Sequence, residues 1–211
     1  MLRNVLAIFT LAATLFAANC GMAVAAPVRI LAFGDSLTAG YGLPEGDGFV
    51  PQLQQALQKM GREVTVINGG VSGDTTAGGL SRLDWMLADK PDVVILELGA
   101  NDMLRGLAPE EARANLDKTI ARIKESGAKL LLVGMLAARN MGEDYRQAFD
   151  TIYPDLARQY DVPLYPFFLE GVAARPELNQ QDGLHPTKEG VGVIVGNILP
   201  YVTRLLDAPA S

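Results

Sequence analysis

Short apolar runs alternate with segments of helical periodicity along this chain, and this alternation constrains the fold most. Four runs span residues 28–33, 64–67, 93–98 and 130–133. Their nearly continuous apolar character is expected of strands that helices cover on both faces. A fifth run at 162–168 contains two prolines, which confine it to the edge of a sheet or to an irregular position. Strands that alternate with helices predict an α/β, three-layer, flavodoxin-like fold of about five parallel strands with helices on both faces.

The intervening segments carry the start and stop signals of helices. Apolar residues recur at helical spacing over 49–60, 75–87, 109–126, 145–156 and 187–202. Pro154 interrupts the fourth of these, so we expect a break near Tyr153. Trp85 lies on the second, where we expect it to pack against neighbours. Residues 68–74 contain three glycines and are predicted to form a loop.

Size and charge exclude several classes of protein. The chain has 211 residues, 49% hydrophobic and 20% charged, which suits one globular domain. The net charge is −6, and lysine and arginine are scattered along the chain. This disfavours a nucleic-acid binder, which needs a basic face, and disfavours electrostatic binding to anionic membranes.

The N-terminus resembles a secretory signal. Arg3 precedes an apolar segment at 5–18, and small residues follow up to Ala26. We therefore expect a signal peptide at 1–26 and a single domain at 27–211. The mature protein is expected to be exported to the periplasm or secreted, with no stable membrane anchor. We also expect a monomer.

The only cysteine, Cys20, lies in this N-terminal segment. It suggests a lipidation site, but Asn19 precedes it where a small residue is expected. Loss of the segment would leave no thiol for catalysis or metal binding, and one histidine is too few for a histidine-rich zinc site. We therefore expect no cofactor and no metal.

Ser36 stands just beyond the first predicted strand, in Gly34-Asp35-Ser36. Ligands bind at the carboxyl ends of strands in open parallel sheets, so this serine is a candidate nucleophile. The alternative is that Ser36 only caps the following helix. A hydroxyl nucleophile needs a nearby base, and the base needs an orienting group. His185 is the only histidine, and Asp182 precedes it by three residues, which suits a base held by a carboxylate.

Negative charge on a carbonyl oxygen in the transition state requires fixed hydrogen-bond donors. The candidates are the backbone N–H groups of Ser36 and Gly73 and the side-chain amide of Asn101. Gly73 is otherwise a plain loop glycine, and Asn101 a residue that satisfies a turn. Asp35 and Asp102 are interpreted as structural residues that bind nearby backbone N–H groups.

The chain lacks G-x-S-x-G, the nucleophile motif of α/β-hydrolases. It instead resembles the SGNH (GDSL) hydrolase family, and most closely its bacterial periplasmic thioesterase, lysophospholipase and arylesterase branch. Four segments carry the resemblance in order: Gly34-Asp35-Ser36-Leu37, Ser72-Gly73-Asp74-Thr75, Gly99-Ala100-Asn101-Asp102 and Asp182-Gly183-Leu184-His185. The likeness runs from about residue 28 to residue 206.

The resemblance implies the SGNH-hydrolase fold, Ser36, Asp182 and His185 as a catalytic triad, and Ser36, Gly73 and Asn101 as the oxyanion hole. It implies hydrolysis of small acyl esters, thioesters or lysophospholipids without a cofactor. The alternative within the family is an O-acetylesterase of carbohydrate or peptidoglycan. A non-enzymatic alternative is an exported binding protein. Residues 103–108 and 136–142 are expected to shape the acyl pocket but carry no recognisable motif.

Overall fold

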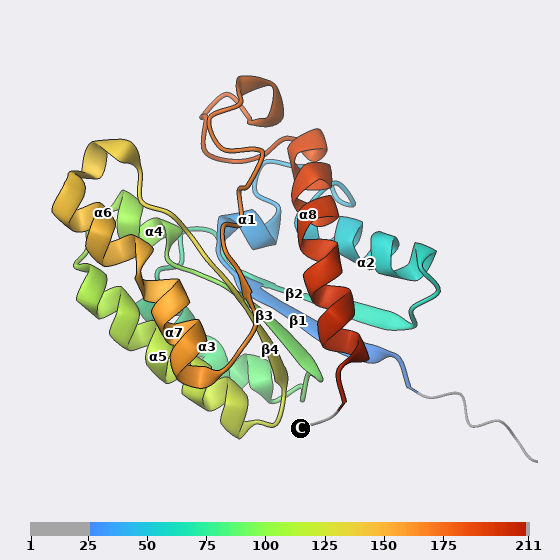
Figure 1. The fold of residues 1–211 in the computed structure, drawn as a ribbon. Helices are drawn as coiled ribbons and strands as arrows, with labels where there is room; N and C mark the ends of the chain where they lie inside the picture. The colour runs from blue at the N-terminus through green and yellow to red at the C-terminus, as the bar shows by residue number, and fades with distance from the viewer. Residues whose placement is uncertain (1–25, 210–211) are drawn as a thin grey trace, which may run out of the picture.

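Five parallel strands form one sheet in the order β2-β1-β3-β4-β5 (Figure 1). The computed structural model describes residues 26–209. The strands are β1 (Val28–Gly34), β2 (Val64–Gly70), β3 (Val93–Glu97), β4 (Lys129–Val133) and β5 (Leu164–Tyr165). This is a flavodoxin-like order, in which the crevice for ligands opens between β1 and β3. The predicted α/β fold is confirmed.

Helices lie on both faces of this sheet (Figure 1). One face is covered by α2 (Phe49–Lys59) and α8 (Lys188–Asp207), and the other by α3 (Thr76–Leu87), α5 (Pro109–Glu125) and α7 (Ile152–Tyr160). The shorter helices are α1 (Ser36–Ala39), α4 (Ala100–Leu104), α6 (Glu143–Asp150), η1 (Arg139–Met141) and η2 (Pro176–Leu178). Within residues 26–209, no helix combines the length and apolar character needed to cross a bilayer.

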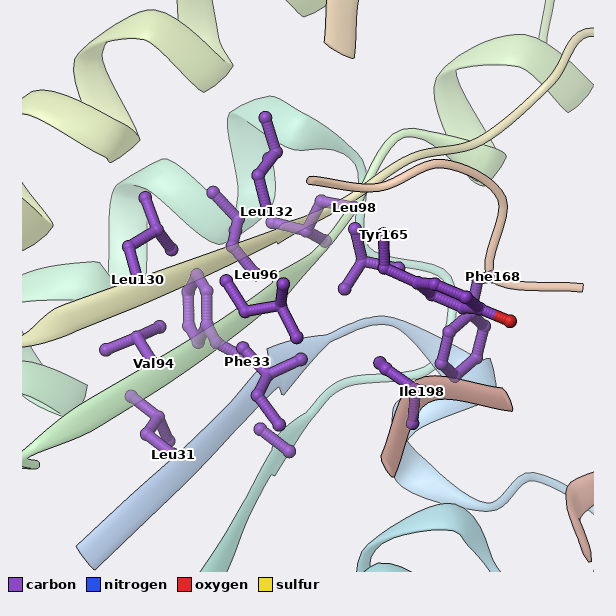
Figure 2. Packing of buried hydrophobic residues seen from close by; sticks show 14 of the residues in the cluster. Leu31, Phe33, Val94, Leu96, Leu98, Leu130, Leu132, Tyr165, Phe168 and Ile198 are labelled. Atoms are coloured by element: carbon purple, nitrogen blue, oxygen red, sulfur yellow. The ribbon is translucent and has the colours of Figure 1, made fainter. Parts of the chain in front are cut away.

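The register of the central strands builds the core. Leu31 of β1 is level with Val94 and Leu130, and Phe33 is level with Leu96 and Leu132. These residues alternate along their strands, so their side chains share one face of the sheet (Figure 2). All six are buried. The core therefore holds the ends of β1 and β3 rigidly beside each other.

The prediction of a loop at 68–74 is wrong for its first three residues, because β2 continues to Gly70. A Cβ atom on Gly70 would lie 2.3 Å from the backbone nitrogen of Ala39, and one on Gly69 2.8 Å from a methyl carbon of Leu31. Glycine is therefore required at both positions, because any side chain would collide with β1 or α1. This is why β2 can continue through these two residues.

Three local predictions differ in detail from the structure. The break in the fourth helical segment falls at Thr151, and Pro154 lies in the first turn of α7, where proline is tolerated. The fifth strand lies at the sheet edge as predicted but contains only two residues. The packing role expected for Trp85 is wrong, because its side chain is 78% exposed. The predicted signal peptide, except Ala26, lies outside the described residues.

Candidate active site

A tight turn after β1 carries Ser36 into the crevice between β1 and β3. Asp35 caps α1, and its Oδ1 accepts a hydrogen bond from the backbone N–H of Leu37 at 3.0 Å. Gly34 packs so closely that a Cβ atom there would lie 2.4 Å from Glu97 Oε2. Ser36 is the first residue of α1, which exposes its hydroxyl at the carboxyl edge of the sheet.

Ser36, His185 and Asp182 form one hydrogen-bonded chain. His185 Nε2 lies 2.9 Å from Ser36 Oγ, and His185 Nδ1 lies 2.7 Å from Asp182 Oδ2. The loop before α8 therefore brings its histidine across 149 residues of sequence to the turn after β1. The arrangement matches a nucleophile, a base and an orienting carboxylate.

The turn from Asp182 to His185 fixes the carboxylate through its own backbone. Asp182 Oδ1 accepts the N–H groups of Leu184 at 2.9 Å and His185 at 3.0 Å. These bonds, then the His185 side chain, lower the pKa of Asp182 to about 2. Gly183 adopts φ = +69°, which a side chain would disfavour. Asp182 is therefore ionised at neutral pH.

Two backbone N–H groups border the same crevice. Among residues 26–209, no hydrogen bond from the N–H of Ser36 or of Gly73 to another protein group is present. Gly73 adopts φ = +84° in the turn before α3. Both residues line the cleft that contains Ser36 Oγ. Both N–H groups are therefore able to donate to a substrate oxygen.

The amide of Asn101 has protein partners already. Its Nδ2 donates to Asp35 Oδ2 at 3.0 Å and to the backbone oxygen of Asp74 at 2.9 Å. An amide nitrogen carries two hydrogens, so both are engaged. Asn101 lines the cleft. Donation to an oxyanion would therefore require one of these bonds to be shared or exchanged.

Two buried carboxyl groups lie beneath the nucleophile turn. Glu97 Oε2 accepts bonds from Thr38 Oγ1 at 2.7 Å and from the backbone N–H of Asp35 at 3.3 Å. Burial raises the pKa of Asp35 to about 6. Burial, and then the charge of Asp35, raises the pKa of Glu97 well above its usual range. Burial therefore favours the protonated form of Glu97.

Arginines that sequence reasoning did not single out support the loop bearing Gly73. Arg82 donates to Asp74 Oδ2 at 2.6 Å and to the carbonyls of Gly34 and Gly69, both at 2.9 Å. Arg105 donates to the carbonyl of Gly73 at 2.6 Å. Their spacing in the sequence gives no signal of these contacts, because most of the partners are backbone carbonyl groups of segments distant in the chain.

The cleft around Ser36 has a volume of about 950 Å³. Much of its wall is apolar and comes from Met103, Leu104, Met135, Leu136, Phe167 and Leu169. Tyr41, another residue without a motif, lines the cleft with its ring centroid 4.6 Å from that of His185. Residues from both segments expected to shape an acyl pocket, 103–108 and 136–142, border this cleft.

Metal chemistry has no evident ligand set in this part of the chain. Residues 26–209 contain no group of three or more His, Cys, Asp or Glu side chains placed to hold an ion. The expectation of a cofactor-free site stays a prediction.

Comparisons with known proteins identify the family of this chain. Residues 32–193 match the GDSL-like lipase/acylhydrolase family. The chain belongs to this family. It is 47% identical over 162 residues to an arylesterase of Vibrio mimicus, which covers 76% of this chain and 81% of that protein.

Further relatives extend the match across the domain. A protein of Escherichia coli K12 named thioesterase 1/protease 1/lysophospholipase L1 is 39% identical over 166 residues, 78% of each chain. The crystal structure of TesA superposes with a TM-score of 0.80 at 40% identity, covering 84% of this chain and 99% of that one. The predicted family and fold are thereby confirmed, and the protein is a carboxylic ester hydrolase of this class.

Proposed function

We propose that this protein hydrolyses small acyl esters and thioesters, including lysophospholipids, through a covalent acyl-enzyme on Ser36. The observation that carries the proposal is the chain of hydrogen bonds from Asp182 through His185 to Ser36, at 2.7 and 2.9 Å. The arylesterase and lysophospholipase names of its relatives support this substrate class.

In the first step, Ser36 Oγ attacks the acyl carbonyl carbon while His185 Nε2 accepts the hydroxyl proton. Asp182 holds the imidazole by Nδ1 and stabilises the imidazolium that forms. The N–H groups of Ser36 and Gly73 stabilise the oxyanion. Asn101 joins them when its amide exchanges one of its protein partners for the substrate oxygen.

In the second step, protonated His185 donates its proton to the departing alcohol or thiol, leaving the acyl group on Ser36. His185 then removes a proton from water while the water oxygen attacks the acyl carbon. It returns that proton to Ser36 Oγ as the acyl–oxygen bond breaks and the acid leaves. The cycle restores the serine and the neutral histidine. It needs no metal or redox group.

The apolar wall of the cleft favours an acyl or aryl group over a sugar. The aromatic residues that line it are Tyr41 and Phe167, whereas sugar sites commonly present several aromatic platforms. The O-acetylesterase alternative therefore predicts a different outcome in the same experiment, with activity confined to acetyl groups.

The test is hydrolysis of 4-nitrophenyl esters from acetyl to palmitoyl by the wild type and by Ser36→Ala. We expect a loss of at least about a thousandfold in kcat for Ser36→Ala, with a chain-length optimum in the wild type. Ser81→Ala is a matched control, because Ser81 lies on the exposed surface of α3. A fluorophosphonate should label the wild type but not Ser36→Ala, and wild-type turnover by that variant would refute the proposal.

We further propose that residues 1–26 direct export and are removed, so that the enzyme acts in the periplasm or outside the cell. The support is the charged, apolar and small-residue order of the segment. Intact mass measurement of the protein from a periplasmic fraction tests it. A protein that retains residues 1–26 in the cytoplasm would contradict it.

A further inference from the structure

Arg139 carries the only permanent charge among the described residues that line the cleft. The other polar lining residues are Ser36, Tyr41, Ser72, Asn101, Asn179 and His185. No carboxylate lines the cleft within residues 26–209, since Asp182 lies behind His185 and Asp35 is buried beneath Ser36. A cationic group in an otherwise uncharged cleft attracts anions.

Most arginines of the described chain are neutralised by carboxylates, as Arg62 is by Asp207 and Arg175 is by Glu177. Within residues 26–209, Arg139 has no ion pair and donates no hydrogen bond, and its side chain is exposed. The protein as a whole is acidic, with a net charge of −6. An unpaired guanidinium is therefore unusual in this molecule, and its five donors are available to a ligand.

The backbone that presents Arg139 is anchored. Arg139 opens η1, and two residues earlier the N–H of Ala137 donates to Asp150 Oδ1 at 2.7 Å. Arg105, by contrast, donates to the carbonyl of Gly73, a residue of the cleft, and so has a structural partner. Arg139 is thus the arginine at this cleft whose charge has no assigned role.

We propose that Arg139 is a specificity-determining residue that binds an anionic group of the ester substrate, a carboxylate or a phosphate. Guanidinium binds both anions through paired N–H donors. The proposal rests on the proposed function, because it names the class of ester that the Ser36 site prefers. The anion can belong to the leaving group or to the far end of the acyl chain, since Arg139 and Ser36 line one cleft.

Two matched pairs of esters distinguish these sources. The leaving-group pair is 4-butyryloxybenzoate and its methyl ester, and the acyl pair is mono-4-nitrophenyl glutarate and 4-nitrophenyl valerate. In each pair one member is anionic and the other neutral. The measured quantity is the ratio of kcat/KM for the anionic ester to that for the neutral ester.

We expect Arg139→Gln to lower this ratio about fivefold in one pair, mainly through KM, because an exposed charge pair contributes modestly. Arg139→Glu should lower it further by repulsion, Arg139→Lys should retain part of it, and 0.5 M NaCl should weaken the wild-type preference. Arg29→Gln is the matched control. Arg29 is also exposed and unpaired in the described chain, but it lies at the opposite end of β1 from Ser36.

An unchanged ratio in both pairs for Arg139→Gln would overturn the role of Arg139. An equal fall in Arg29→Gln would also overturn it, because net charge alone would then explain the preference. Failure of the wild type to hydrolyse any of the four esters would instead overturn the proposed function. The two failures are therefore distinguishable.

Discussion

Two aspartates flank Ser36, and their environments shift their pKa values in opposite directions. Asp35 precedes Ser36, is completely buried, and has its pKa raised to about 6 by that burial. Asp182 reaches Ser36 through His185, is exposed, and has its pKa lowered to about 2 by hydrogen bonds. Both carboxylates accept backbone N–H groups. The pKa values shift in opposite directions because Asp182 stays exposed to solvent, whereas Asp35 is removed from it.

The two aspartates are therefore expected to have different roles. We call the environment of Asp182 the exposed side of Ser36, and that of Asp35 the buried side. The exposed side keeps a permanent negative charge next to His185, as the proposed mechanism requires. The buried side holds the turn, because Asp35 binds the N–H of Leu37 and the amide of Asn101. Changes on the exposed side should therefore affect turnover, and changes on the buried side should also affect stability.

The largest effect is expected for Asp182→Asn. Loss of the charge leaves the His185 tautomer unfixed and the imidazolium without its partner, so kcat should fall by roughly 10³–10⁴-fold. Steady-state hydrolysis of a short aryl ester measures it. Asp89→Asn, an exposed aspartate at the other end of the sheet, is the control. Retention of more than a tenth of kcat would mean that the exposed carboxylate has no catalytic role.

Asn101→Ala tests whether the amide that binds Asp35 also stabilises the oxyanion. If the amide reaches the oxyanion, kcat should fall by about 10²–10³-fold with little change in KM. If its bonds to Asp35 and Asp74 are its only role, the free energy of unfolding should fall while kcat of the folded protein is kept. Urea unfolding and steady-state kinetics on one preparation separate the two outcomes.

Asp35→Asn should change how stability depends on pH. In the wild type the folded state binds the Asp35 proton more tightly than the unfolded state, because the pKa rises from 3.8 to about 6. The stabilisation from this bound proton is therefore present below pH 4 and is lost as pH rises through 6, by on the order of 3 kcal/mol. Glu97 acts in the same direction.

Asparagine retains the oxygen that caps Leu37 but does not titrate, so the stability of Asp35→Asn relative to the wild type should rise between pH 4 and pH 7. Urea unfolding at several pH values measures this difference. A constant difference over that range would show that Asp35 titrates normally. Asp182 titrates near pH 2, outside this window, so it does not confuse the result.

Much of the site was predictable because its base had a single candidate in the chain. A single histidine, with Asp182 three residues before it, left few ways to activate Ser36, and the structure brings the three together. The parallel sheet followed from apolar runs. The engaged amide of Asn101 and the bond from Arg105 to Gly73 depend on turns distant in sequence, so no local pattern could predict them.

The smallest effect is expected for Trp85, where the sequence prediction of packing was wrong. Periodicity along α3 cannot decide whether a residue at the margin of the apolar stripe meets a neighbour, and this side chain is 78% exposed. Trp85→Ser should therefore change the free energy of unfolding by less than about 0.5 kcal/mol. Leu83→Ala, two residues away and fully buried, should cost about 2–5 kcal/mol. A loss above 1 kcal/mol for Trp85→Ser in urea unfolding would mean that burial of the side chain does not determine its contribution on this helix.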